Sequence, residues 1–222
     1  WGEMCFPDEN YDYDECIIAC GASSIVPPLP GVSLPGVFTM RTPQDAIELR
    51  EYLEQTGAKR AVVAGGGFIG LEVAENLMQK GLAVTVIDMA DQIMPGFDKD
   101  MADYARRHLE SKGIKVRLNT RLEAVLGESK AEGIRVPDGE IKADVVVMSL
   151  GIRANTAFLK DTGLAMEKGA ILTDDQGRTA TSNALPFRVY TGKELLADQL
   201  AQDKLGAGTM ILSYGCLPEL TR

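Results

Sequence analysis

The fold of this chain is decided by the stretch Ala61–Gly70, which has the sequence AVVAGGGFIG. Its four apolar residues predict a buried strand, and the glycines after them predict a tight turn that opens a helix. We expect that helix over Phe68–Gln79, and a second apolar strand over Leu82–Asp88 ends on an acid. This order of strand, glycine turn, helix, strand and acid, within about 30 residues, is typical of a unit that binds a dinucleotide.

Each glycine of the turn has a separate expected role. Gly65 permits the tight turn, Gly67 lets the backbone approach a pyrophosphate, and Gly70 lets helix and strand pack closely. The first turn of the helix offers free N–H groups and a partial positive charge to the phosphates. Asp88 stands where a carboxylate can accept hydrogen bonds from ribose hydroxyls. The alternative, a structural glycine turn in an unrelated α/β domain, is less favoured because every contextual feature of the fingerprint is present.

Length, composition and charge narrow the classes of protein to consider. The chain has 222 residues, of which 45% are hydrophobic, and a formal net charge of −9. These values fit a globular protein of one or two domains, and the negative charge argues against a nucleic-acid partner. No apolar run is long enough to span a membrane, and no secretory signal opens the chain. The four cysteines have no metal-ligand or CxxC spacing, so we expect a cytoplasmic protein.

The order of elements predicts the fold class. Residues 25–36 hold four prolines and must be extended, so we expect a linker there between two domains. Helices are predicted over 42–57 and 98–112, strands over 114–118 and 143–150, and a hairpin over 134–141, with residues 121–126 continuing the sheet. The result is an α/β, Rossmann-like domain with a mostly parallel sheet, helices on both of its faces and a β-hairpin. The glycine turn and Gly151 both follow strands, at the edge where such sheets bind ligands.

Beyond this pattern, the sequence resembles a known family. The segments GGGFIGLE (65–72), AENL (74–77) and IDMADQIMP (87–95) are similar to the nicotinamide domain of the flavin-dependent pyridine nucleotide-disulfide oxidoreductases. Within this family, the motif sequences are most similar to the branch of coenzyme A-disulfide reductases, NADH oxidases and NADH-dependent persulfide reductases. Two flanking segments, residues 13–22 and 143–156, also resemble the family, with Cys20 and Ala154 in place of its usual Thr and Pro. The resemblance covers about residues 11–183.

The resemblance implies a role for each residue of the motif. Gly65, Gly67 and Gly70 would hold the NADH pyrophosphate, and Asp88 the adenosine ribose. An acid rather than an arginine at this position favours NADH over NADPH, since a carboxylate repels a 2′-phosphate. Phe68 would lie over the nicotinamide, Glu72 near its carboxamide, and Gly151 would let the ring approach the flavin. The predicted cofactor-binding residues are Gly65, Gly66, Gly67, Phe68, Ile69, Gly70, Glu72, Asp88, Met89 and Gly151, with no catalytic residue and no metal ligand in this chain.

For two of these residues the sequence leaves a plainer interpretation open. Phe68 could simply pack in the core, as an aromatic side chain usually does. Glu72 could be a solvated acid in the first turn of the helix, where it would complement the helix dipole.

The resemblance also implies a division of the chain. We expect residues 1–40 to be a remnant of an FAD-binding domain with a crossing linker, 41–152 the NADH-binding domain, 153–193 a return to the FAD-binding domain, and 194–222 an unmatched tail. The family's FAD fingerprint and redox cysteine would precede Trp1, so the chain resembles a fragment. Lys193 stands near the family's flavin-binding Asp, and residues 184–222 are expected to pack poorly or to mimic only part of that domain.

The implied chemistry is hydride transfer from NADH to FAD, and then to a small-molecule or protein-bound disulfide, a persulfide or O₂. FAD is expected in the parent protein, which would be a homodimer, but not in this chain alone, which would turn over little. Two alternatives stay open. One is an NADH-binding sensor or regulatory module without catalysis, and the other is the NADH domain of a ferredoxin-, rubredoxin- or nitrite-reductase-type flavoprotein.

Overall fold

The computed structural model describes residues 2–5, 10–13, 15–175, 177–179, 188–189 and 209–213. The chain divides into two compact units. The first combines Trp1–Ser23 with Arg153–Arg222, and the second is the continuous segment Ser24–Ile152. The glycine turn lies in the second unit.

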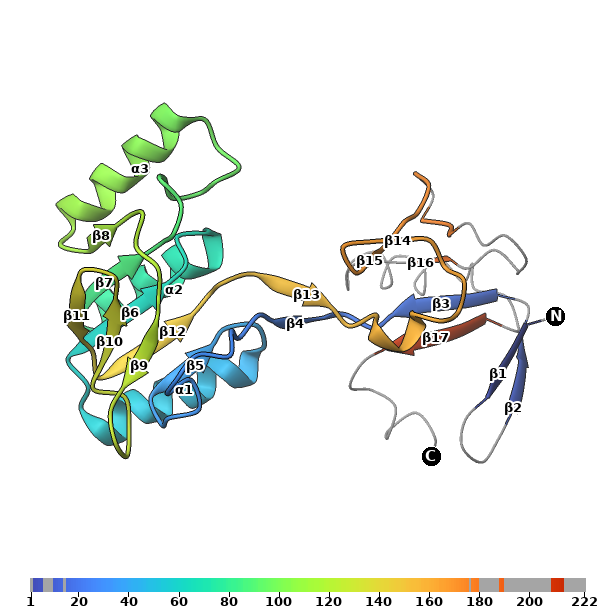
Figure 1. Ribbon diagram of the computed structural model, residues 1–222, viewed down its shortest axis with the longest axis horizontal. Helices are drawn as coiled ribbons and strands as arrows, with labels where there is room; N and C mark the ends of the chain where they lie inside the picture. Colours follow the sequence, from blue (N-terminus) through green and yellow to red (C-terminus); the bar gives the residue numbers. More distant parts are fainter. Residues whose placement is uncertain are drawn as a thin grey trace. The chain divides into compact units, whose positions relative to one another are not determined.

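The second unit is built on a five-stranded parallel sheet (Figure 1). Every pair of neighbours in it runs parallel, so the carboxyl ends of the strands meet at one edge. In spatial order the strands are β5 (Val37–Thr39), β12 (Val145–Met148), β6 (Arg60–Ala64), β7 (Ala83–Ile87) and β8 (Lys115–Arg117). The predicted α/β fold class with a mostly parallel sheet is therefore confirmed.

Three helices accompany this sheet, close to their predicted positions. They are α1 (Pro43–Thr56), α2 (Phe68–Gln79) and α3 (Lys99–Ser111). The start of α1 is fixed by a capping box, in which Thr42 accepts a hydrogen bond from the Asp45 N–H and Asp45 accepts one from the Thr42 N–H. Its end is fixed by Gly57, which has φ +61° and donates to the Leu53 carbonyl.

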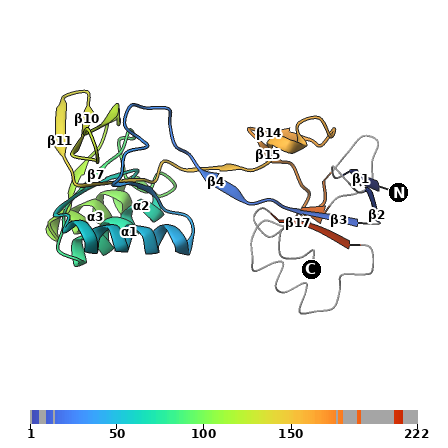
Figure 2. The same ribbon diagram turned by 90° about the horizontal axis from the view of Figure 1, so that it is seen from below.

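The helices cover only one face of the sheet, so the prediction of helices on both faces is wrong. One buried cluster joins alternate strand residues such as Val63 and Val147 to Leu49 of α1 and Leu77 of α2. The opposite face contributes Val62 and other strand residues to a second cluster that contains no helical residue. Figure 2 shows α1, α2 and α3 on one side of the sheet and strands on the other.

The second face is covered by a small antiparallel sheet and by the proline-rich segment. This sheet has the order β11 (Gly139–Lys142), β10 (Gly133–Val136) and β9 (Ala124–Leu126). The predicted hairpin is confirmed as the β10–β11 pair, but residues 121–126 do not continue the main sheet, since β9 pairs with β10 instead. Leu29, Val32 and Leu34 of the proline-rich segment complete the cover.

The first unit contains a second set of short strands. In it β3 (Glu15–Ala19) pairs in parallel with both β16 (Arg188–Val189) and β17 (Thr209–Ser213). Its other elements are β1 (Gly2–Cys5), β2 (Asn10–Tyr13), the 3₁₀ helix η1 (Ala157–Leu159), β14 (Met166–Glu167) and β15 (Ala170–Ile171). The boundary between the units falls within β4 (Ala22–Ser24) and β13 (Ile152–Ala154). Apart from β16 and β17, the segment 184–222 lies outside the described residues.

A charged pair ties the starts of β6 and β12 together. The Asp144 carboxylate accepts hydrogen bonds from the N–H groups of Lys59 and Arg60, at 3.0 and 2.9 Å, and from the Arg60 guanidinium at 2.6 Å. The side-chain hydrogen bond from Arg60 lowers the pKa of Asp144 to about 2. The ionised carboxylate is therefore the form that the fold holds.

We expect Asp144→Asn to destabilise the chain at pH 7 by about 1–2 kcal/mol, a range reduced for the partial exposure of the pair. The folded pKa is depressed, so this contribution is present above the usual carboxyl pKa and is lost as the pH falls towards 2. Urea unfolding of both proteins between pH 7 and pH 3 measures it, and the gap should narrow below about pH 4. Asp138→Asn, which removes an exposed partner of Arg117, should cost less than about 0.5 kcal/mol. Equal losses for the two variants would contradict the role given to Asp144.

Candidate functional site

The glycine turn begins where β6 ends against the end of β12. The Ser149 N–H donates to the Ala64 carbonyl at 2.7 Å, and the Gly65 N–H donates to the Ile87 carbonyl at 2.8 Å. Gly65 has φ +115°, and a Cβ there would stand 2.1 Å from the Ser149 carbonyl oxygen. Both the backbone conformation and the close approach therefore require glycine at this position.

The helix packs directly on this turn. A Cβ at Gly70 would stand 2.0 Å from the Gly65 carbonyl oxygen, so only glycine lets α2 come this close. Gly67 is the N-cap of α2, and it makes no side-chain capping bond. A Cβ at Gly67 would meet nothing within 4 Å, so packing alone does not demand glycine there. Open space thus borders N–H groups that have no partner within the helix.

Asp88 lies across from the turn and is held by it. Its carboxylate accepts from the Gly66 N–H at 2.6 Å and from the Ala90 N–H at 2.8 Å. Each carboxylate oxygen has two acceptor positions, so both oxygens can accept further hydrogen bonds from a hydroxyl-bearing ligand. The structure thus brings Asp88 and the glycine turn together.

The loop after Asp88 closes over the turn, which the sequence analysis did not anticipate. The Met94 N–H donates to the Gly66 carbonyl at 2.8 Å, and the fully buried Ile93 side chain lies against Gly66. A Cβ at Gly66 would stand 2.9 Å from Ile93 Cγ2. Ile93 is one of several apolar residues in the segment DMADQIMP, so the sequence carries no signal that singles out this contact.

Apolar side chains are exposed beside the turn. The exposed fractions of Phe68, Ile69 and Met89 are 63%, 47% and 68%. The Phe68 ring makes an edge-to-face contact with Phe97, at 5.6 Å between ring centroids. Phe68 is therefore not a core residue, and Phe97 is a neighbour of the candidate site that the sequence analysis missed.

The remaining predicted residues are Glu72 and Gly151. Glu72 is exposed, and it lies beyond the first turn of α2, which holds no acidic residue, so the first-turn interpretation is wrong. Gly151 follows β12 with φ +98°, a conformation that favours glycine, and its carbonyl accepts from the Ile25 N–H at 2.9 Å. Since β12 and β6 are parallel neighbours, Gly151 and the glycine turn follow the same edge of the sheet.

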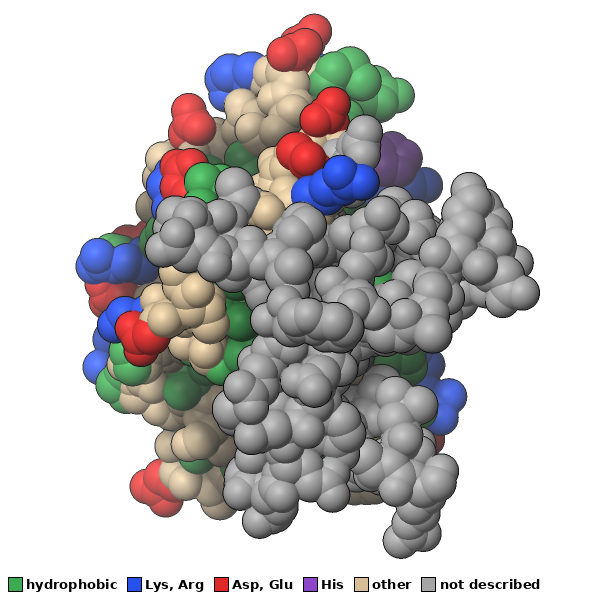
Figure 3. All heavy atoms as spheres, turned by 90° about the vertical axis from the view of Figure 1, so that its right-hand side faces the viewer, with side chains coloured by type: hydrophobic (Ala, Val, Ile, Leu, Met, Phe, Trp, Pro, Cys, Tyr) green, Lys and Arg blue, Asp and Glu red, His purple; other side chains and the backbone are tan. Residues whose placement is uncertain are grey.

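The surface elsewhere shows mixed charge. Figure 3 shows acidic and basic side chains next to one another at the end of the second unit that holds α3. Within the described ranges, no three His, Cys, Asp or Glu residues are grouped so that they could hold a metal ion. None of the described helices has the length and hydropathy to cross a membrane.

Comparisons with known proteins agree on one family. The sequence profile of the pyridine nucleotide-disulphide oxidoreductases matches residues 5–184. The NADH oxidase of Methanocaldococcus jannaschii is 39% identical over 175 residues, which are 78% of this chain and 39% of that protein. This chain therefore spans about two fifths of the length of the curated relatives it matches.

Solved structures of the same family also resemble this chain over most of its length. The NAD-dependent persulfide reductase from A. fulgidus matches with a TM-score of 0.74 at 36% identity, over 83% of this chain and 34% of that one. The water-forming NADH oxidase from Lactobacillus brevis, bound to NADH, matches with a TM-score of 0.73 at 30% identity, over 82% of this chain and 39% of that one. An engineered variant of the latter is a water-forming NADPH oxidase bound to NADPH, with a TM-score of 0.73 and 28% identity over the same shares.

The profile match and these relatives, like the glycine turn itself, point to one conclusion. This chain belongs to the pyridine nucleotide-disulphide oxidoreductase family, and the resemblance predicted from its sequence is confirmed.

Proposed function

We propose that this chain supplies the NADH-binding part of an FAD-dependent oxidoreductase. The observation that carries the proposal is the turn itself, in which open space at Gly67 borders the uncapped start of α2 and the Asp88 carboxylate lies opposite. These features fit a dinucleotide, because a helix N-terminus binds phosphate and a carboxylate binds ribose hydroxyls.

Each part of the site has a proposed task. Gly65, Gly66 and Gly67 of the turn, with Ile69 and Gly70 at the start of α2, shape the backbone that binds the pyrophosphate. Asp88 accepts from the ribose hydroxyls, and the exposed Met89 borders the adenosine half. Phe68, Glu72 and Gly151 face the nicotinamide half, where Phe68 excludes water and Glu72 binds the carboxamide.

The chemistry that bound NADH and FAD supply is hydride transfer from nicotinamide C4 to flavin N5. The residues of this chain contribute position rather than proton transfer, since reacting atoms must approach to about 3–3.5 Å in a dry site. We propose that the electrons leave to a disulfide, a persulfide or O₂, in a cytoplasmic homodimer.

The domain division is also a proposal. The linker of residues 25–36 was expected between the domains, but it packs on the nucleotide-binding unit, where the Val125 N–H donates to the Pro30 carbonyl at 2.8 Å. The compact unit Ser24–Ile152 supports an NADH-binding domain that is extended to include this linker. Residues 1–23 and 153–193 would then belong to the FAD-binding domain.

Cofactor choice is supported by the engineered relative. Its five substitutions replace a glycine, an aspartate, an alanine, a methionine and a proline. These five positions have the same spacing along the chain as Gly70, Asp88, Met89, Ala90 and Pro95, with the alanine and methionine in the opposite order. We therefore place the choice between NADH and NADPH at Asp88 and its two successors.

Calorimetric titration of the chain with NADH, NADPH and FAD tests the proposal. We expect micromolar binding of NADH, binding of NADPH that is about 10 to 100 times weaker, and no binding of FAD. A chain that binds neither nicotinamide cofactor would contradict the proposed function.

We expect Phe68→Ala to weaken binding of the nicotinamide half of NADH and to leave binding of the adenosine half unchanged. Because the ring is 63% exposed, its loss should change the free energy of unfolding by less than about 1 kcal/mol. Affinity for NADH should fall about three- to tenfold through the lost ring contact, while ADP-ribose, which lacks nicotinamide, should bind as before. Calorimetry with both ligands measures this, and Phe158→Ala, which alters an exposed ring of the first unit, is the matched control. An equal loss for both ligands would place Phe68 outside the nicotinamide half.

A further inference from the structure

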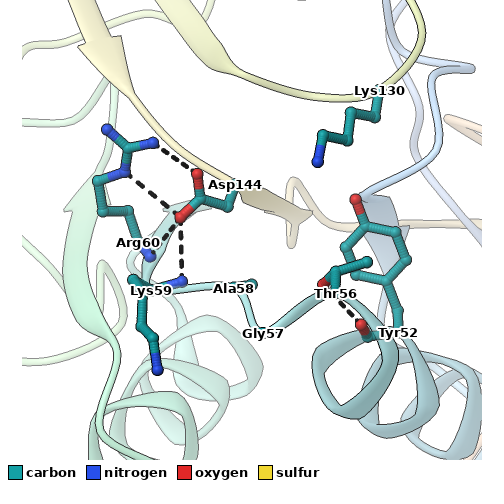
Figure 4. A pocket seen from close by; sticks show the side chains of 8 residues that line it. All are labelled: Tyr52, Thr56, Gly57, Ala58, Lys59, Arg60, Lys130 and Asp144. Atoms are coloured by element: carbon teal, nitrogen blue, oxygen red, sulfur yellow. Dashed lines mark hydrogen bonds and ion pairs between the residues drawn. The ribbon is translucent and has the colours of Figure 1, made fainter.

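A hollow of about 380 Å³ lies at the edge of the parallel sheet opposite to the glycine turn (Figure 4). It opens where β6 and β12 begin, beside the carboxyl end of α1. Its polar lining includes Tyr52, Lys59, Arg60, Lys130 and Asp144. None of these residues belongs to the proposed NADH site.

The charged side chains that line this hollow leave a net positive charge. Asp144 is neutralised by the Arg60 guanidinium and by two backbone N–H groups. Lys59 and Lys130 are exposed, and neither ammonium group forms an ion pair with any residue that the structure describes. Two uncompensated positive charges therefore border a hollow of a chain with net charge −9.

The side chains on the rim start from fixed backbone positions. At Lys130, the carbonyl oxygen lies against Gly127, where a Cβ would come within 1.8 Å of it. At Lys59, the carbonyl accepts from the Ala83 N–H at 2.8 Å and the N–H donates to Asp144. Because the backbone at both lysines is held in place, less conformational entropy is lost when the two flexible side chains bind a ligand.

Tyr52 contributes a fixed hydroxyl to the same rim. Its ring packs edge-to-face on Phe38, at 5.3 Å between centroids, and the space left by Gly36 admits its hydroxyl. Burial and the nearby Asp144 carboxylate raise the pKa of Tyr52, so the hydroxyl stays protonated and can donate. Figure 4 shows Lys130 and the Tyr52 hydroxyl on one side of the hollow and Arg60 and Asp144 on the other. The Lys59 ammonium is directed away from the Tyr52 hydroxyl, so its flexible side chain has to turn to reach a shared ligand.

We infer that this hollow binds a small molecule through a phosphate group held between Lys130, Lys59 and the Tyr52 hydroxyl. Ammonium groups act as point charges that suit tetrahedral phosphate, whereas a planar carboxylate is best matched by the fork of an arginine. The Arg60 fork is already occupied by Asp144, which leaves only the donors suited to phosphate. A hollow of this volume has room for more than the phosphate alone, which favours pyrophosphate or a phosphate ester.

Amide NMR spectra of the full chain, titrated with pyrophosphate in the presence and absence of NADH, test this inference. We expect the Gly57, Ala58 and Lys59 signals to shift under both conditions. Lys130→Gln and Lys59→Gln should each weaken pyrophosphate binding about three- to tenfold. Lys112→Gln, which alters an exposed lysine just after α3, should leave it unchanged. Shifts confined to Gly65–Gly70, or equal affinity in all three variants, would overturn the inference.

Ribose 5-phosphate, titrated in parallel, identifies the source of the phosphate. Shifts of the same amides with tighter binding than inorganic phosphate would assign the hollow to a phosphate ester, and tighter binding of pyrophosphate would assign it to an inorganic diphosphate. No shift at these amides with any of the three probes would overturn the inference. The outcome is separate from the proposed function, because loss of NADH binding with these shifts retained would contradict only the NADH site.

Discussion

Gly67→Ala is expected to abolish measurable NADH binding while the chain stays folded. Gly67 has φ −78°, which alanine adopts freely, and a Cβ there meets no other atom within 4 Å. In the proposed complex the pyrophosphate approaches the start of α2 through this empty space, so the added methyl would collide with the ligand instead of the protein. We expect affinity to fall at least about a hundredfold, which corresponds to about 3 kcal/mol.

The cost to folding should be small for this variant. Glycine is a better N-cap than alanine, so the free energy of unfolding should fall by about 1 kcal/mol at most. Calorimetry with NADH and urea unfolding of the same sample measure the two quantities. If the variant binds NADH as the parent chain does, the glycine turn is not the pyrophosphate site.

Gly65→Ala is the matched comparison, because there the conflict lies within the protein. Gly65 has φ +115°, and its Cβ would stand 2.1 Å from the Ser149 carbonyl oxygen. We expect this variant to lose about 2–4 kcal/mol of stability together with NADH binding, through strain and overpacking. Stability that falls in Gly65→Ala but not in Gly67→Ala would separate the structural glycine from the one that leaves room for the ligand.

The sequence predicts the local elements well, because their signals are local. Thr42 and Gly57 mark the ends of α1, and the stretch 61–70 gives strand, turn and helix in order. The sequence does not show which face of the parallel sheet the helices cover. Strands such as Val145–Met148 are apolar on both faces, so their composition is the same whether helices or a second sheet lies on them. The cover by β9–β11 depends on contacts between segments far apart in the chain.

The same limit applies to the site. The spacing of the glycines and Asp88 is a property of one short unit, and the structure brings these residues together. The contact of Phe68 with Phe97, and of Gly66 with Ile93, depends on the path of the loop that follows Asp88. No periodicity fixes the path of such a loop, so these neighbours could not be predicted from the pattern of the unit.

Asp88→Asn is expected to reduce the preference for NADH over NADPH by about tenfold or more. The Asp88 carboxylate lies within 2.6 Å of the Gly66 N–H, and in the proposed complex it would face the adenosine ribose. A 2′-phosphate would bring negative charge to this carboxylate, and removing one unit of repulsion at such short range corresponds to at least about 1.4 kcal/mol. The affinity for NADPH should therefore rise relative to that for NADH.

Comparing Asp88→Asn with Asp88→Ala separates the effect of the carboxylate charge from the effect of its hydrogen bonds to the turn. Asparagine retains an oxygen that can accept from the Gly66 N–H, so the turn should keep its shape, whereas Asp88→Ala leaves the N–H groups of Gly66 and Ala90 without this acceptor. We therefore expect Asp88→Ala to lose about ten- to a hundredfold in NADH affinity, and Asp88→Asn to lose less. Both variants should discriminate less against NADPH, because both lack the charge.

The ratio of the two dissociation constants, measured by calorimetry at low and high salt, is the decisive quantity. If charge repulsion sets the preference, the ratio for the parent chain should shrink as salt rises, while the ratio for Asp88→Asn should depend much less on salt. Asp91→Asn is the matched control, since it removes an exposed carboxylate of the same loop. A ratio that stays at the parent value in Asp88→Asn would show that the preference does not arise from this carboxylate, and the neighbours Met89 and Ala90 would then have to account for it through shape alone.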